Sequence, residues 1–432
     1  MTNTNPGARY ERGGGRRAAT ALLPLLLTAL AACQSGGQAE AGGTKGTKNP
    51  APVATPVFET RLDGQLSAAS KATAAAGSST FTATVSYGSA HGTAVDTSTG
   101  TQDYAADTAR AERELTIPRR FPEDAASDLG GRAGGSAVRE TYEVQGNRVD
   151  YLTRQGDWLR YSSRASMDIV DDFEGALVRA GDSAPYGGTL AEVVRTAHAT
   201  KQPAKGADGV RTYELSVPPR TAAPALPPAF QHALLYFEGS EQITLTVVLD
   251  KQGRLLRAGA DYAPALAALH KGGRLKGVTS LKAEYVLTGH GTTKVPAPAA
   301  GAAGGKLKDA EKALTRLTEV KPGSCGSADT GLGGSLSLVR VVPCGKGADV
   351  RVFGQVEVKE TIQDNPAGVA DRKAGDRCRT KFDTAPAAWV NRARPAGTFY
   401  TWGGASSSSD YTGPDVDIEG AYACYVELSG RR

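Results

Sequence analysis

The segment AVRETYEVQGNRVDYLTRQGDWLRYSS, residues 137–163, contains three short runs in which apolar and polar side chains alternate. Such alternation is typical of strands that bury one face. Turn-forming pairs separate the runs at Gly146-Asn147 and Gly156-Asp157. The segment therefore predicts three short antiparallel strands joined by tight turns.

Runs of the same kind lie on both sides of this segment. They predict strands at 81–87, 93–108, 110–117, 212–217, 243–249 and 281–287. Apolar residues at helical spacing predict helices at 61–76, 168–180, 188–199 and 228–239. Because the helices are inserted between groups of antiparallel strands, we expect an α+β domain over residues 58–290, with the helices gathered on one face of the sheet.

The facing surfaces of these strands and helices are rich in apolar side chains. If the two surfaces meet fully they form a sealed core, whereas helices that stand off the sheet leave a cavity on the order of several hundred Å³, the usual size of a ligand site. We predict such an apolar pocket. Its expected lining is Phe81, Val85, Tyr87, Phe173, Leu177, Val194, Phe230, Leu234, Leu245, Val247 and Tyr285.

Two stretches of this region carry a family resemblance. They are GNRVDYLTRQGDWLRY at 146–161, and ITLTVVLDKQGRLLRAGADY at 243–262, where a strand ends in an Asp-x-x-Gly-Arg turn and a second strand returns. Both, in this order of elements, resemble the actinobacterial lipoproteins related to LppX, LprG and the LolA carriers. The resemblance implies a half-open antiparallel β-barrel around helices, with an apolar cavity for acyl chains. It carries no catalytic signature.

The N-terminus has the features of a lipoprotein signal. In GRRAATALLPLLLTALAAC, residues 15–33, basic residues precede an apolar run that ends in small residues and Cys33. The run is too short to span a bilayer, and its flanks are those of a secretory signal. We expect cleavage after residue 32, diacylglycerol and palmitate on Cys33, and a flexible tether at 33–57. The alternative is an ordinary signal peptide in which Cys33 is an unmodified thiol.

The charge of the chain limits its partners. The 432 residues carry a formal charge of +5. Residues 1–32 hold four arginines and one glutamate, a net +3, so the chain from Cys33 onward carries about +2. Beyond the signal there is no run of lysines or arginines, which argues against a nucleic-acid partner. The expected location is the outer face of the cytoplasmic membrane, reached through a lipid anchor and not a membrane-spanning helix.

Four further cysteines fall in the last third of the chain, at Cys325, Cys344, Cys378 and Cys424. In an exported protein an even number favours disulfides, and four cysteines allow three connectivities. One of these, Cys325–Cys344 with Cys378–Cys424, would staple two separate hairpins. A zinc site is disfavoured because there is no CxxC pair.

The same region carries a second resemblance. VVPC at 341–344, GDRC at 375–378, Trp389, FYTW at 399–402 and CYV at 424–426 are similar to the septum-formation-like family of actinobacterial membrane proteins and lipoproteins. The resemblance implies a small, disulfide-stapled, β-rich domain, which we place at 307–432. The composition of residues 291–306 predicts a linker before it, and Leu307, Ala310, Leu314 and Leu317 at helical spacing predict a short helix at its start. That family usually has a His and a Glu after its second cysteine. This chain has Ala348 and Arg351 there, so any site built on that histidine is lost.

Catalytic and metal-binding patterns are missing from the sequence. It has no GxSxG elbow, Walker loop or HExxH helix, and its five histidines are scattered. DxDxEG at 415–420 begins like a calcium loop, but its twelfth position is Val426 and not glutamate. A strand with its acids toward water is the preferred interpretation. We expect no enzyme activity, no metal and no cofactor.

These observations support two functional hypotheses. The first is a lipid-anchored envelope protein that binds or carries an amphiphile in an apolar cavity of the larger domain, while the smaller domain binds a protein partner. The second is a structural or interaction lipoprotein of the envelope with a closed core and no ligand. The packing between sheet and helices discriminates between them.

Overall fold

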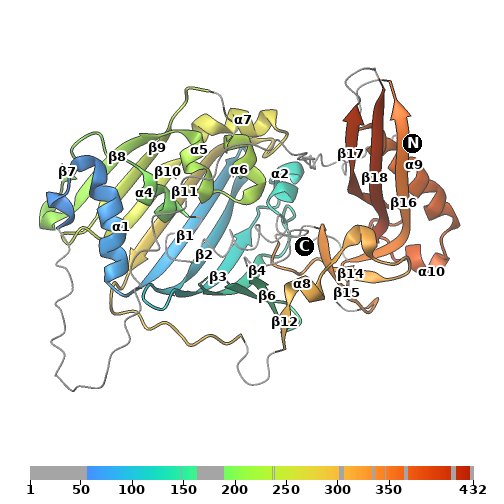
Figure 1. Ribbon diagram of the computed structural model, residues 1–432, viewed down its shortest axis with the longest axis horizontal. Helices are drawn as coiled ribbons and strands as arrows, with labels where there is room; N and C mark the ends of the chain where they lie inside the picture. The colour runs from blue at the N-terminus through green and yellow to red at the C-terminus, as the bar shows by residue number, and fades with distance from the viewer. Residues whose placement is uncertain are drawn as a thin grey trace, which may run out of the picture.

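The structure is a computed structural model that describes residues 56–146, 148–162, 189–235, 237, 239–300, 306–332, 336–345, 347–363, 368–409 and 415–428. These residues form two lobes, a large one coloured blue to yellow and a small one coloured orange to red (Figure 1). Each lobe combines a β-sheet with helices. The mixed α+β class predicted from the sequence is therefore confirmed. Within the described ranges no helix is long and apolar enough to cross a membrane.

The large lobe is organised by a 12-stranded sheet with the order β12-β6-β5-β4-β3-β2-β1-β11-β10-β9-β8-β7. The strands are β1 Ser78–Ser89, β2 Gly92–Asp103, β3 Thr108–Thr116, β4 Val138–Gln145, β5 Arg148–Leu152, β6 Trp158–Ser162, β7 Ala204–Lys205, β8 Arg211–Val217, β9 Ile243–Leu249, β10 Leu255–Asp261, β11 Val278–Thr288 and β12 Leu307–Asp309. All neighbours are antiparallel except β12, which pairs in parallel with β6. Within the described residues the end strands β7 and β12 pair with one neighbour each, so the sheet is open.

Short helices cover one face of this sheet (Figure 1). They are α1 Gln65–Ala75, α2 Glu123–Asp128, α4 Leu190–Thr196, α5 Pro219–Ala222, α6 Pro228–Leu235 and α7 Leu266–Lys271. In α1 the buried side chains Leu66, Ala69 and Thr73 recur at helical spacing and face the sheet. The opposite face carries the alternate, mostly polar side chains of the strands. The large lobe therefore has one dry and one wet sheet face, as antiparallel sheets commonly do.

The small lobe has a six-stranded sheet with the order β13-β15-β14-β16-β18-β17. Its elements are α8 Ala310–Ala313, β13 Thr315–Arg316, β14 Cys325–Ser327, β15 Leu338–Val342, β16 Val350–Ile362, α9 Val369–Thr384, α10 Ala387–Val390, β17 Tyr400–Ser409 and β18 Val416–Glu427. Helix α9 packs on the long strands through Ala370, Ala374 and Cys378. Strands β16, β18 and β17 extend beyond the rest of the lobe as an arm (Figure 1).

Several sequence predictions are confirmed, among them the three strands of 137–163 and the strands near 81–87, 212–217, 243–249 and 281–287. The boundary expected near 108 was wrong: β2 ends at Asp103, whose carboxylate accepts hydrogen bonds from the N–H groups of Ala105 and Ala106. This local capping turns the chain before β3 begins. The predicted helix at 168–180, with Phe173 and Leu177, lies outside the described residues, as do Cys33 and the tether to residue 55.

The helix expected through Leu307 and Leu317 was wrong. Residues Leu307–Asp309 form strand β12 on the edge of the large sheet, the four residues of α8 are α-helical, and Leu317 begins a separate 3₁₀ turn, Leu317–Glu319. Ala310 and Leu317 are nevertheless fully buried. The apolar spacing predicted burial correctly, while backbone pairing with β6 determined the conformation.

Candidate functional site

The predicted cavity residues that the structure describes come together between the sheet and the helices. Phe81, Tyr87 and Tyr285 of the sheet belong to the same hydrophobic cluster as Phe230 and Leu234 of α6. The cluster also includes the predicted residues Val194, Leu245 and Val247, and Val85 packs against it partly buried. Each of these side chains except Val85 is at most 1 % exposed. The two surfaces thus meet as a packed core.

A small cavity remains at this interface. It measures about 20 Å³ and lies between β1, β2 and β11 on one side and the start of α4 with residues 225–227 on the other. Its lining is Ala83, Thr84, Val85, Asp96, Ser98, Thr189, Leu190, Ala225, Pro227, Ala283, Glu284 and Tyr285. A volume of this size has room for about one water molecule. It does not accommodate an acyl chain.

Asp96, which lines the cavity, belongs to a buried ionic triad with Arg113 and Glu140. Arg113 Nε donates to Asp96 Oδ1 at 2.7 Å, and the other side of the guanidinium is ion-paired with Glu140. All three residues are at least nine-tenths buried. Burial by itself lowers the pKa of Arg113, but the two carboxylates outweigh it and raise that pKa well above its usual value. The triad holds one positive and two negative charges among apolar neighbours.

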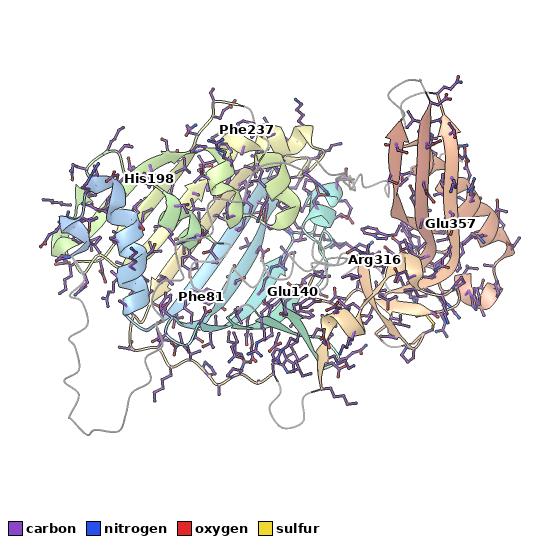
Figure 2. The ribbon with its side chains drawn as sticks, viewed as in Figure 1. Phe81, Glu140, His198, Phe237, Arg316 and Glu357 are labelled. Carbon is purple, nitrogen blue, oxygen red and sulfur yellow. A yellow bond between two sulfur atoms is a disulfide. The ribbon has the colours of Figure 1, made fainter. Side chains whose placement is uncertain are left out.

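The triad connects the cavity to the small lobe. Tyr142 lies two residues after Glu140 on the same strand face, and its hydroxyl is 3.0 Å from Glu140 Oε2 and 3.1 Å from the carbonyl oxygen of Gly331. Phe81 and Glu140, labelled in Figure 2, lie on the same face of the sheet, three strands apart, and both are buried. Polar contacts therefore run from the cavity wall, across the sheet, into residues of the small lobe.

The two lobes meet along a seam, which we define as Tyr142, Tyr151, Arg154 and Tyr161 of the large lobe against residues 328–331, Arg340 and Asp349 of the small lobe. Asp329 is its centre. Tyr151 donates its hydroxyl proton to Asp329 at 2.6 Å, and the Arg154 N–H donates at 2.7 Å. Burial, with the nearby charges of Glu140 and Asp329, raises the pKa of Tyr151. The seam is therefore a hydrogen-bonded and dry contact.

Apolar packing reinforces the seam. Ala310, Leu314 and Leu338 of the small lobe share one hydrophobic cluster with Tyr151 and Tyr161 of the large sheet. The Tyr161 hydroxyl donates to the carbonyl oxygen of Thr330. Arg340 is 5 % exposed and lies 3.7 Å from both Asp157 and Asp329. The seam thus combines burial, ion pairs and strand pairing, so the lobes form one body.

A second contact ties the linker to the wet face of the large sheet. The N–H groups of Ala299 and Ala300 donate to the Glu143 carboxylate at 2.9 and 2.8 Å. Nearer β11, Ser78 Oγ donates to the carbonyl oxygen of Thr293 at 2.8 Å. The linker predicted at 291–306 therefore lies along the sheet over the part that the structure describes.

The cysteines pair as Cys325–Cys344 and Cys378–Cys424, with Cα–Cα distances of 5.1 and 5.4 Å. The first joins the β14–β15 hairpin, as expected. The second links helix α9 to strand β18 and does not staple a hairpin. The other two connectivities are excluded.

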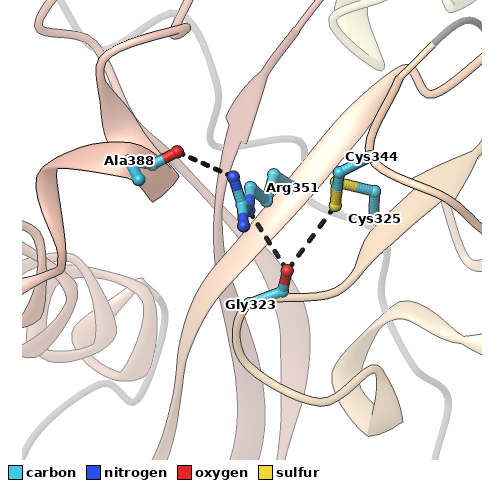
Figure 3. The surroundings of a disulfide bond; sticks show 5 residues. All are labelled: Gly323, Cys325, Cys344, Arg351 and Ala388. Carbon is cyan, nitrogen blue, oxygen red and sulfur yellow. Dashed lines mark hydrogen bonds between the residues drawn. A yellow bond between two sulfur atoms is a disulfide. The ribbon is translucent and has the colours of Figure 1, made fainter.

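Arg351, one of the two positions singled out by the sequence resemblance, has a structural role. Its Nε donates to the Gly323 carbonyl oxygen at 3.1 Å and its Nη1 to the Ala388 carbonyl oxygen at 2.7 Å, beside the first disulfide (Figure 3). Burial and the neighbouring Arg392 lower the pKa of Arg351. The side chain fastens the disulfide hairpin to α10.

The remaining polar candidates do not form a site within the described residues. Residues 416–427, which contain most of the calcium-like motif, are strand β18, with Asp417 and Glu419 exposed and Ile418 buried between them. His290 contacts a backbone carbonyl oxygen, and no group of three or more His, Cys, Asp or Glu side chains in the described part of the chain has metal-binding geometry.

The ionic triad was missed at the sequence level, although a signal for it exists. Ala109, Ala111, Arg113 and Leu115 alternate along β3, so the arginine is in phase with buried residues. A charged residue in an apolar phase indicates a buried partner of opposite charge.

A comparison with protein-family models and with curated proteins gave no match.

Proposed function

We propose that this chain is a lipid-anchored, non-enzymatic envelope protein that serves as a rigid interaction module with a closed core. The observation that carries the proposal is the packed interface of sheet and helices, where a cavity of about 20 Å³ replaces a ligand-sized pocket. The seam supports it as well, because a buried seam holds the two lobes in one orientation. Two lobes in a fixed orientation suit a protein that binds other proteins and holds them in a defined arrangement.

The anchor is the first element to test. We propose acylation of Cys33, with the mature protein on the outer face of the cytoplasmic membrane. Cys33→Ala should abolish incorporation of a labelled fatty acid, because Cys33 is the cysteine that directly follows the small residues of the signal. Gln34→Ala is the matched control and should label normally. Labelling of Cys33→Ala would refute the lipid anchor.

A carrier of amphiphiles is the second candidate, and one observation favours it. The cavity lies where the resemblance to the LppX, LprG and LolA proteins implies a ligand site, between the sheet and the helices, and small residues such as Ala83, Ala225 and Ala283 line it. Ala83 and Val85 are only partly buried there. In this interpretation the open sheet is a half-open barrel, and the cavity is the closed form of a larger pocket.

Native mass spectrometry of the gently purified full chain separates the two candidates. A carrier should retain a lipid, and Ala83→Trp should remove it by filling the cavity. Thr82→Trp is the control because its side chain is on the opposite face of the same strand. If the chain is an interaction module, the unmodified protein, Ala83→Trp and Thr82→Trp should each show only the mass of the chain and its anchor. A bound lipid that Ala83→Trp displaces and Thr82→Trp does not would overturn the closed-core proposal.

A further inference from the structure

The inference concerns strand β17, and it starts from the ends of the two sheets. Exposed sheet edges present unpaired N–H and C=O groups, and proteins usually shorten, charge or cover them. The large sheet ends in β7, two residues with Lys205, and in β12, three residues with Lys308. One end of the small sheet is β13, which also has only two residues. These three edges are short and contain charged residues.

The fourth edge, β17, has none of these protections. It runs for ten residues, YTWGGASSSS, without a charged residue or a proline. It pairs with β18 from Tyr400 to Ser409 in an unbroken register, with no bulge. Within the described residues its other side pairs with no strand. The part of β17 from Thr401 to Ser409 thus offers an extended edge for strand addition.

Tyr400 and Trp402 pack at the start of β17, whereas the side chains of its outer half add little to its stability. Gly403, Gly404 and residues 406–408 are exposed, so the outer half of the strand is held mainly by backbone hydrogen bonds to β18. Strands that are polar on both faces and rich in glycine accept new pairings readily, because no buried face fixes them. Small side chains also present no steric barrier to a neighbouring strand.

The charges around β17 identify the occupant. Near its start lie the exposed Arg379, whose guanidinium is 4.5 Å from the Phe399 ring centroid, and the exposed Arg394. Near its end lie the exposed Asp417 of β18 and the exposed Asp415, which directly precedes that strand. An antiparallel two-fold pairing places the start of one β17 beside the end of the other. The basic end of each copy then meets the acidic end of its partner.

We propose that β17 pairs with β17 of a second copy of this chain, in antiparallel orientation about a two-fold axis, to join the two small sheets into one. The tether of the same chain is a poorer occupant. It carries prolines at 50, 52 and 56, and it enters the structure at α1, at the far end of the molecule from β17 (Figure 1).

A single-cysteine scan of the full chain in its membrane tests the pairing. Gly404→Cys, Ala405→Cys, Ser406→Cys and Ser407→Cys are oxidised mildly, and non-reducing gels report the covalent dimer. Directly opposed residues of an antiparallel pair have Cα atoms about 4.5–5.5 Å apart, within disulfide range. Only the residue nearest the two-fold axis lies opposite the same residue of the second copy. We therefore expect one position to give at least tenfold more dimer than Ala421→Cys, an exposed control one strand inward.

Charge reversal tests the assigned partner. In the cross-linking variant, Arg394→Glu and Asp415→Arg should each reduce the dimer several-fold, and the double variant should restore it because both ends are exchanged together. Counting one free thiol per chain confirms that the native disulfides are intact. The proposal is overturned if no position exceeds the Ala421→Cys control, if the cross-linked product contains a different polypeptide, or if the double variant stays as low as the single ones.

Discussion

Most buried apolar side chains of the large lobe that the structure describes form one large cluster, a second cluster continues across the seam, and no disulfide lies among these residues. The small lobe has smaller clusters of its own and carries both disulfides. The difference follows from the surface that each sheet can cover. Among the described residues, six helices lie over the large sheet, while the arm of the small lobe is covered by α9 on one face. Where burial is limited, covalent links supply the missing stability. The ionic triad and the seam lie between the lobe that is stabilised mainly by burial and the lobe that also relies on disulfides.

The largest expected effect is at the triad. Arg113→Leu should lower the free energy of unfolding by about 3–5 kcal/mol, because Asp96 and Glu140 would remain as uncompensated buried charges. Arg110→Leu is the matched control on the opposite face of β3. Its side chain is 36 % exposed and 3.7 Å from Glu143, so it should cost about 1 kcal/mol or less. Urea denaturation measures both; equal losses would show that the triad does not act as a buried unit.

The disulfides come next, and both belong to the small lobe. Replacing Cys378 and Cys424 by alanine should cost about 4 kcal/mol, and replacing Cys325 and Cys344 about 3 kcal/mol, since the loops close over 46 and 19 residues. Tryptophan fluorescence during denaturation follows the small lobe through Trp389 and Trp402. A greater loss for the shorter loop would show that native-state contacts, and not loop length, set the order.

The seam is expected to contribute less. Tyr151→Phe removes the hydroxyl donor to Asp329 and should cost about 1–3 kcal/mol, because the buried carboxylate loses a partner. Tyr213→Phe removes a similar donor, 2.6 Å from Gln65, but inside the large lobe. Only Tyr151→Phe should separate the unfolding of the two lobes into distinct transitions. Identical single transitions for both variants would mean that the seam does not couple the lobes.

The smallest effect depends on pH. Burial lowers the pKa of His290 below its ordinary value of about 6.5, while its Nε2 lies 2.9 Å from the Leu255 carbonyl oxygen. The unfolded chain then binds a proton at higher pH than the folded chain does, so stability should fall as the pH drops below about 6.5. His290→Gln should remove this part of the slope, at most about 1.4 kcal/mol per pH unit. An unchanged slope between pH 5 and 7 would contradict the assignment.

Local patterns predicted most of the large lobe and the class of the fold. Alternation identified the strands, and helical spacing identified α1, because both record which face is buried. Strand β12 could not be predicted in this way, since its partner β6 lies far away in the sequence and three residues carry no period. The disulfide connectivity was likewise open, because four cysteines do not encode which loops approach each other.

The candidate site shows the same limit in another form. The apolar lining was predicted as a set, and the described members do converge. Whether they enclose space depends on how closely α6 approaches β1 and β11, and this distance is set by packing and not by composition. The sequence contains the charged residues Asp96, Arg113 and Glu140, but their burial was not predicted. Predicting it requires asking whether a polar residue also occupies a position that alternates with the buried residues of its strand.

The contacts of residues 289–300 with the large sheet have a consequence for resistance to proteases. Residues 289–300 have the small, proline-bearing composition of a segment that proteases usually attack. Cleavage requires an extended stretch that can leave its surroundings and enter the enzyme's cleft. Here the N–H groups of Ala299 and Ala300 are engaged by Glu143, and the backbone near Thr293 is bound to Ser78. The same three contacts that align residues 289–300 along the sheet thus withhold this segment from digestion.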